Sequence, residues 1–167
     1  MKENILATIF DTFSESDLKN LEKWHEAYKN KDIKPPHLMG RYLDIEWINV
    51  NKARMLLGIS NKNRYNNFHG GALFTLCDLT IAEHIFHLVG NTKHVSTLEL
   101  KINYLKSSDA MYVTAESHIL HLGKTTVVAD CCLYDANSIL IAKASGTFFL
   151  KEMEVSNNES SQSFRSV

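Results

Sequence analysis

The most apolar segment of the chain runs from Gly70 to about Val89, where apolar side chains cover nearly the whole circumference of a helix. A helix that is apolar on all sides is a buried helix. Four titratable residues interrupt the segment, namely Asp78, Glu83, His84 and His87. Because no uninterrupted apolar run approaches the ~20 residues that a bilayer span needs, we expect a soluble protein without a membrane partner. The pattern predicts a core helix with a carboxylate, Asp78, inside it.

Alternating apolar and polar positions predict strands on both sides of this helix. Two strand-forming runs, at about 42–48 and 53–59, precede an Asn-rich loop. After the helix, turn signals divide residues 94–150 into four strand-length segments, and these signals fall at 107–109, 123–124 and 135–137. Consecutive strands with short turns favour an antiparallel sheet, so the order of elements predicts an α+β fold and not a parallel doubly wound one.

A second helix is predicted before the first strand. Ser14 and Asp17 form an N-cap signal, and apolar or aromatic residues recur at helical spacing from Leu18 to Tyr28. This helix should end near Asn30 and dock on the folded domain. After the last strand the sequence is polar, which predicts a flexible tail. We therefore expect three parts: a helical extension at 1–36, one folded domain at 37–151 and a tail at 152–167.

The start of the central helix carries candidate chemistry. Gly70 and Gly71 leave the first backbone N–H groups uncovered by side chains, and those groups lie at the positive end of the helix dipole without intrahelical partners. They are a candidate site for a carbonyl oxygen or an oxyanion. Asp78 lies on the same face as Gly71 but about 10 Å further along the axis. If both groups serve one reaction, two copies of the helix should meet, which predicts a homodimer with two shared sites.

These residues also carry a resemblance to a known family. The spacing of Asn63, His69-Gly70-Gly71 and Asp78, together with the segments 97–104 and 144–148, resembles PaaI-like hotdog-fold acyl-CoA thioesterases over roughly residues 41–150. The resemblance implies a long central helix wrapped by an antiparallel sheet, in a homodimer or a dimer of dimers (homotetramer). It also implies hydrolysis of an acyl-CoA thioester, with coenzyme A as part of the substrate and no separate cofactor.

The same resemblance assigns roles to individual residues. Asp78 would be the nucleophile or general base, and the Gly70 or Gly71 amide would polarise the thioester carbonyl. Asn63 would position the attacking water or the substrate. Thr97 would assist from the following strand.

Structural interpretations of these residues stay open beside the catalytic ones. Asp78 is compatible with a partly wet subunit contact, and the two glycines with a close approach of the helix to a strand. Asn63 is equally compatible with a plain turn. For His69, capping or orienting the loop is favoured over a role as acid or base.

Thr97 and Glu83 each pose a geometric question. In a regular strand Thr97 would point away from the helix, because the apolar residues after it alternate with it. Either the strand bends at its start, or the site reaches round the strand end, or Thr97 is a surface residue. Glu83 lies some 140° from Asp78 around the helix axis, so the two cannot face each other. Glu83 is expected to pair with a nearby His or Lys, or to face solvent.

Composition narrows the class of protein. The 167 residues, 44% hydrophobic and 22% charged, are typical of one globular domain, and the formal net charge of −1 gives no footprint for nucleic acid. No basic segment followed by an apolar one opens the sequence, so secretion is not expected. The three cysteines include Cys131 and Cys132, which should point to opposite faces of a strand. This usage suits reduced thiols in the cytoplasm.

Other chemistry is less well supported. His118 and His121 should lie on opposite faces of a strand, and no complete set of metal ligands emerges, so no metal is expected.

No single basic residue stands out as a contact for the coenzyme; the candidates are Arg54, Arg64, Lys93, Lys106 and Lys124. The alternative function is a non-catalytic module that binds or senses acyl-CoA. Hydration or dehydration of a thioester is less favoured, because His69 and Asp78 do not match an Asp/His dyad.

Overall fold

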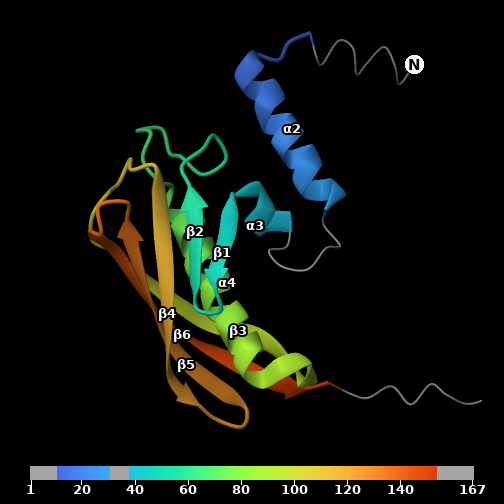
Figure 1. Cartoon of the computed structure of the whole chain (residues 1–167), viewed down its shortest axis with the longest axis vertical. Helices are drawn as coiled ribbons and strands as arrows, with labels where there is room; N and C mark the ends of the chain where they lie inside the picture. Colours follow the sequence, from blue (N-terminus) through green and yellow to red (C-terminus); the bar gives the residue numbers. More distant parts are fainter. Residues whose placement is uncertain (1–10, 31–37, 154–167) are drawn as a thin grey trace, which may run out of the picture.

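Figure 1 shows the computed structural model of the protein, in which residues 11–30 and 38–153 are described. The elements in chain order are α2 (Glu15–Lys29), α3 (Leu38–Tyr42), β1 (Ile45–Asn49), β2 (Lys52–Leu56), α4 (Gly70–Val89), the 3₁₀ turn η1 (Gly90–Thr92), β3 (Lys93–Tyr104), β4 (Tyr112–Leu122), β5 (Thr126–Asp135) and β6 (Leu140–Glu152). Two strands before the central helix and four after it are as the sequence predicts.

The strands form one antiparallel six-stranded sheet in the order β1-β2-β4-β5-β6-β3. Strands β4, β5 and β6 form a meander, since each pairs with the next one in the chain. Strand β3 precedes them in the chain but pairs with β6, which places β3 at one edge of the sheet. The α+β fold with a single antiparallel sheet is confirmed.

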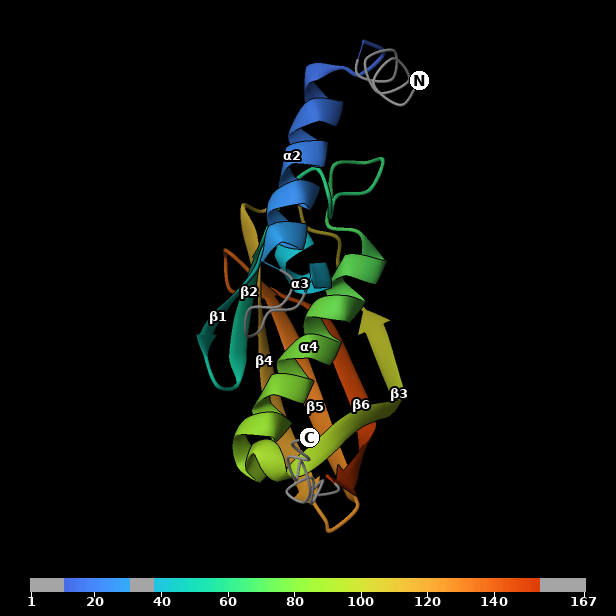
Figure 2. The same ribbon diagram turned by 90° about the vertical axis from the view of Figure 1, so that its right-hand side faces the viewer.

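Helix α4 lies along one face of this sheet (Figure 2). Four of its apolar side chains are completely buried, namely Leu76, Cys77, Ile81 and Ile85. They belong to the core cluster that Met55 of β2 and Phe148 of β6 join from the sheet. By length and composition α4 could cross a membrane, but its contacts with the sheet account for its apolar character.

Strand pairing shifts register at four places in the described residues, and two of these shifts, β-bulges in β3 and β4, change the side-chain alternation at residues considered in the sequence analysis. Thr97 pairs with Phe148 but Glu99 pairs with Thr147, so Leu98 is an extra residue in β3. In β4, Leu120 is the extra residue between Ile119 and His121. A bulge shifts the alternation by one position, so residues on either side of it with odd spacing can share a face.

The bulge in β4 overturns one expectation from the sequence. His118 pairs with Asp130 and His121 with Val128, and these two partners are two residues apart on β5. The two histidines therefore lie on the same face of the sheet, not on opposite faces.

Among residues 11–30 and 38–153, no three His, Cys, Asp or Glu side chains gather into a metal-binding group.

Helix α2 begins at the predicted cap. The Asp17 N–H donates to Ser14 Oγ at 3.2 Å and the Ser14 N–H donates to Asp17 Oδ2 at 2.9 Å, which makes a capping box. Lys23 of this helix forms an ion pair with Asp44 and donates to Ser60 Oγ at 2.8 Å. The predicted docking is therefore observed, and polar contacts contribute to it.

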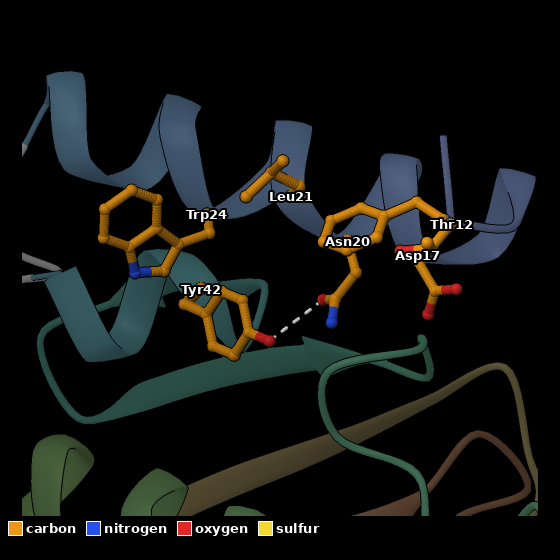
Figure 3. Close-up of a pocket in the computed structure, with 7 residues that line it drawn as sticks. Thr12, Asp17, Asn20, Leu21, Trp24 and Tyr42 are labelled. Atoms are coloured by element: carbon orange, nitrogen blue, oxygen red, sulfur yellow. Dashed lines mark hydrogen bonds between the residues drawn. The ribbon is translucent and has the colours of Figure 1, made fainter. Parts of the chain in front are cut away.

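The apolar residues of α2 are less buried than the helical spacing predicts. Leu18, Trp24 and Tyr28 are 37%, 46% and 44% exposed. A groove of about 560 Å³ lies under this helix, and in it the Tyr42 hydroxyl donates to Asn20 Oδ1 at 2.9 Å. Figure 3 shows the residues that line this groove. None of the candidate site residues lines this groove.

Some expectations fall outside the described residues. These are the Pro35–Pro36 break and most of the polar tail. The predicted division of the chain at residues 36 and 151 stays a prediction, although β6 continues to Glu152.

Candidate active site

A buried asparagine anchors the loop that leads into α4. Asn61 is 1% exposed, its Oδ1 accepts from the Gly58 N–H at 2.9 Å, and its Nδ2 donates to the carbonyls of Leu43 and Leu56 at 3.0 and 2.7 Å. Its own carbonyl accepts from the His69 N–H at 2.7 Å. Asn61 therefore ties the residue before α4 to β2 and to the chain before β1. This asparagine could not be distinguished from its neighbours by sequence, because burial depends on the tertiary fold.

His69 is the N-cap of α4. Its Nδ1 accepts a hydrogen bond of 3.0 Å from the Gly71 N–H, with the backbone in an extended conformation (φ −72°, ψ 133°). The predicted capping role is confirmed. The Gly71 amide is thereby occupied, whereas the Gly70 N–H has no acceptor among the described residues. Of the two candidate amides, Gly70 is the one available to a ligand.

Both glycines face a ring at close range. A Cβ on Gly70 would lie 3.3 Å from the Tyr104 ring, and a Cβ on Gly71 would lie 3.2 Å from His69 Nδ1. The Tyr104 hydroxyl also donates to the Gly70 carbonyl at 2.7 Å. The close approach to a strand that the glycines suggest is therefore present at Gly70.

Asp78 and Thr97 meet between α4 and β3. The Thr97 hydroxyl donates to Asp78 Oδ1 at 2.8 Å. Val95 packs against the core two residues before Thr97, and Leu100 and Ile102 do so after the bulge at Leu98. The strand therefore departs from regular alternation near its start, which is the first of the three possibilities that the sequence left open.

Asn63 forms a turn. Its Oδ1 accepts from the backbone N–H groups of Tyr65 and Asn67 at 2.8 and 3.2 Å, which is an Asx-type arrangement. The turn interpretation is confirmed by these bonds. These two hydrogen bonds fix the orientation of the Asn63 side-chain amide, because both are accepted by Oδ1. The Asn63 Nδ2 is therefore free to donate, and it has no acceptor among the described residues. A role of Asn63 toward a substrate stays a prediction.

A groove of about 300 Å³ adjoins the start of α4. Its apolar lining comes from Met39, Leu43 and Ala72, and its polar lining from Ser60, Lys62, His69, Gly71 and Thr75. Among the described residues, no carboxylate lines it. The groove lies between α3, the loop before α4 and the first turns of α4. Two of the candidate residues, His69 and Gly71, line it.

Cys77, the residue before Asp78 in α4, is not a competing nucleophile. The hydrogen bond with Cys131, followed by burial, raises the pKa of the Cys77 thiol well above its usual range. Cys77 is therefore a protonated core residue. Glu83 lies 3.8 Å from His87 Nδ1 on the next turn of the helix, which agrees with the expected pairing.

The basic residues considered for the coenzyme lie in varied surroundings. Lys93 is 3.0 Å from the Glu152 carboxylate, the Arg54 guanidinium lies 4.6 Å from the centre of the Tyr112 ring, and Arg64 lies 5.2 Å from that of Tyr65. These contacts do not single out one of them as a phosphate ligand.

Comparison with known proteins gives the class. The model of the Thioesterase superfamily matches residues 65–142. A Saccharolobus solfataricus protein whose name describes it as a proposed esterase is 31% identical over 140 residues, which cover 84% of this chain and 87% of that protein. A second protein of that organism, similarly named, is 29% identical over 119 residues, covering 69% and 84%.

Solved structures share the fold. A Bacillus halodurans protein crystallised with CoA has a TM-score of 0.77 at 22% identity, covering 89% of this chain and 99% of its own. A variant of a hypothetical thioesterase from Streptococcus pneumoniae has a TM-score of 0.57 at 29% identity, covering 65% and 89%. The fold is the hotdog fold. The chain belongs to the thioesterase superfamily.

Proposed function

We propose that this protein is a PaaI-like acyl-CoA thioesterase that hydrolyses its substrate at two sites shared between the subunits of a homodimer. The observation that carries the proposal is the Thr97–Asp78 hydrogen bond on the helix whose first N–H, that of Gly70, has no acceptor among the described residues. A polarising amide and an oriented carboxylate are the two groups that thioester hydrolysis needs. The B. halodurans protein with the same fold was solved with CoA, which supports a CoA thioester as substrate.

The distance along α4 supports a shared site. Eight residues separate Gly70 from Asp78, which is about 12 Å along the axis, so one helix does not place both groups on one carbonyl. Two antiparallel copies of α4 in contact would bring the amide of one subunit near the carboxylate of the other. Each dimer would then hold two equivalent sites.

The position of β3 at the edge of the sheet supports the same assembly. Strand β3 is an edge strand of 12 residues, and a long edge strand is a ready surface for pairing with another chain. Leu98 on β3 is 60% exposed and Phe74 on α4 is 37% exposed. A second copy that pairs along β3 would cover both. A dimer of dimers is compatible with this contact.

The reaction then follows from the groups present. The Gly70 N–H would donate to the thioester carbonyl oxygen and stabilise the negative charge that develops there. Asp78, with Oδ1 held by Thr97, would use Oδ2 to deprotonate a water that attacks the carbonyl carbon, or would attack that carbon directly. With water as the nucleophile, the C–S bond would break, the CoA sulfur would leave and take up a proton as the thiol, and the acyl group would leave as a carboxylic acid. With Asp78 as the nucleophile, the C–S bond would break to leave the acyl group on Asp78 as an anhydride, and a water would then hydrolyse this anhydride to release the carboxylic acid and restore Asp78.

The experiment that tests the proposal is release of free thiol from a panel of acyl-CoAs by the wild type and Asp78→Asn. Asp78→Asn should lose most turnover and keep the fold. Glu83→Gln, which changes a carboxylate on another side of the same helix, should keep both the turnover and the fold. Wild-type rates in Asp78→Asn would overturn the assignment. Saturable binding without turnover in the wild type would favour the non-catalytic acyl-CoA module.

A further inference from the structure

One lysine connects helix α2 to the loop that leads into α4. The helix lies against α3 at the end of the molecule where α4 begins (Figure 2). Lys23 on this helix forms an ion pair with the Asp44 carboxylate and donates a hydrogen bond of 2.8 Å to Ser60 Oγ. Its side chain is 19% exposed, whereas Lys19, one turn earlier, is exposed and has no polar partner among the described residues. Lys23 is therefore a specific contact and not a general surface charge.

We infer that Lys23 is a positioning residue of the candidate active site. It restrains the turn at residues 58–61, and through that turn it restrains the N-cap of α4. The restraint stands on the contacts alone, and its effect on catalysis rests on the proposed function. The inference makes α2, which carries none of the candidate site residues, a supporting element of the site.

The two partners of Lys23 belong to different segments of the chain. Asp44 follows α3 with a left-handed backbone (φ 58°), and its carbonyl accepts from the Leu56 N–H at 3.4 Å. Ser60 lies in the turn after β2, and a Cβ on Gly58 of that turn would lie 3.6 Å from Lys23 Nζ. One ammonium group thus joins the corner before β1 to the turn after β2.

Asn61 holds the same turn from its buried side. Its Oδ1 accepts from the Gly58 N–H at 2.9 Å, and its Nδ2 donates to the Leu43 carbonyl at 3.0 Å. Lys23 contacts the turn from the side of α2. Without the Lys23 ammonium group, the turn would keep only the contacts on its buried side, and the carboxylate next to it would lose its cation.

The turn is bonded directly to the start of α4. The Asn61 carbonyl accepts from the His69 N–H at 2.7 Å, and His69 Nδ1 accepts from the Gly71 N–H at 3.0 Å. These two bonds fix the first turn of the helix, and with it the direction of the Gly70 N–H. Misplacing a catalytic group by roughly 1 Å can cost on the order of a hundredfold in rate. A looser turn would therefore weaken the candidate oxyanion donor without a change at Asp78.

Amide hydrogen exchange tests the restraint without requiring turnover. Lys23→Met keeps a long unbranched side chain but removes the charge and the donors, and Lys23→Arg keeps both. In Lys23→Met the amides of residues 58–71 should exchange at least about fivefold faster than in the wild type, while those of β5 should be unchanged. Lys23→Arg should restore exchange to within about twofold of the wild type.

Ser60→Ala separates the turn from the docking of α2. It removes the hydrogen bond to the turn and leaves the ion pair between Lys23 and Asp44 in place. Exchange at residues 58–61 should therefore rise at least about twofold, while α2 keeps its protection. A Ser60→Ala protein with wild-type exchange in the turn would overturn the inference, even if Lys23→Met releases α2 as a whole.

Steady-state kinetics test the consequence for catalysis. Lys23→Met should lower kcat about fivefold or more and change KM by less than about twofold, because the Gly70 N–H acts on charge that develops in the transition state. Lys19→Met is the matched control on the same helix, and its exchange and kcat should stay within about twofold of the wild type.

Three results would contradict the inference: unchanged exchange at residues 58–71 in Lys23→Met, an equal increase in Lys19→Met, or faster exchange in Lys23→Met with wild-type kcat. A wild type that hydrolyses no acyl-CoA, together with the expected exchange in the Lys23 variants, would overturn the hydrolase proposal and leave the restraint on the turn in place.

Discussion

Thr97 donates a hydrogen bond of 2.8 Å to Asp78 Oδ1, from an edge strand to the central helix. The bond exists because Leu98 is an extra residue in β3, which turns Thr97 toward α4. It holds one oxygen of the carboxylate and leaves Oδ2 available. Asp78 is thus an oriented carboxylate at a partly buried position, which is the state that a nucleophile or a general base requires.

Replacing Thr97 separates orientation from packing. Thr97→Val keeps the shape of the side chain but removes the hydroxyl, so kcat should fall about tenfold, as expected for loss of a hydrogen bond to a charged group. Thr97→Ser keeps the hydroxyl and should stay within about threefold of the wild type. Steady-state kinetics on the best acyl-CoA provide the comparison. Equal rates for Thr97→Val and the wild type would remove Thr97 from the site.

Gly70→Pro deletes the candidate polarising N–H with little change to the helix. Proline is favoured at the first position of a helix, and the extended backbone of His69 (φ −72°, ψ 133°) suits a residue that precedes proline. We expect kcat to fall about a hundredfold, which is the scale of losing one oxyanion donor. Gly70→Ala keeps the N–H and adds the same Cβ contact with Tyr104, so it is the matched control. If both variants lose the same activity, crowding and not the N–H is responsible.

Tyr104→Phe tests whether β3 holds the start of α4 in place. The hydroxyl donates to the Gly70 carbonyl at 2.7 Å, and its loss should cost about 1 kcal/mol. Burial, and then the nearby Cys77, raises the pKa of the Tyr104 phenol, so the group is protonated and can donate at neutral pH. Calorimetry should show Tm lower by about 2–4 °C. The control is Tyr112→Phe, since the Tyr112 ring lies against the Arg54 guanidinium. An equal decrease of Tm in the two variants would contradict a specific role of the Tyr104 hydroxyl.

His84 should make stability depend on pH. Burial, and then the charges of His118 and His87, lower the pKa of His84 from its usual 6.5, and its Nδ1 lies 3.0 Å from Ser117 Oγ. As the pH falls below 6.5, the unfolded chain takes up a proton on His84 before the folded protein does. The free energy of unfolding therefore declines as the pH falls from 6.5 toward the lower pKa of His84 in the folded protein. Thermal unfolding of His84→Gln between about pH 7.5 and pH 5.5 should show a smaller loss of Tm than the wild type. An identical loss in both proteins would exclude His84 as a source.

The sequence predicted the elements well because their signals are local. The all-apolar segment and the glycines at its start defined α4 from Gly70 to Val89, and Ser14 with Asp17 defined the start of α2. Turn residues divided the second half of the chain into its strands. Each of these signals depends on neighbours within a few residues, which the sequence displays directly.

Features that depend on register or burial were not accessible in this way. The extra residues in β3 and β4 are leucines, Leu98 and Leu120, and carry no glycine or proline signal. Their effect was to bring Thr97 to Asp78 and to place two histidines on one face. The anchoring role of Asn61 was likewise hidden, because one asparagine in a polar loop is distinguished only by what the fold packs around it.

The most direct test of the shared site uses mixed dimers. Asp78→Asn and Gly70→Pro subunits, carrying different affinity tags, are expressed together, and the mixed dimer is purified and assayed for thiol release. If each site takes its carboxylate from one subunit and its amide from the other, the mixed dimer has one intact site and should recover about half of the wild-type turnover. Both parent homodimers should stay inactive. A mixed dimer as inactive as its parents would contradict the account, because the two groups would then have to act within one subunit.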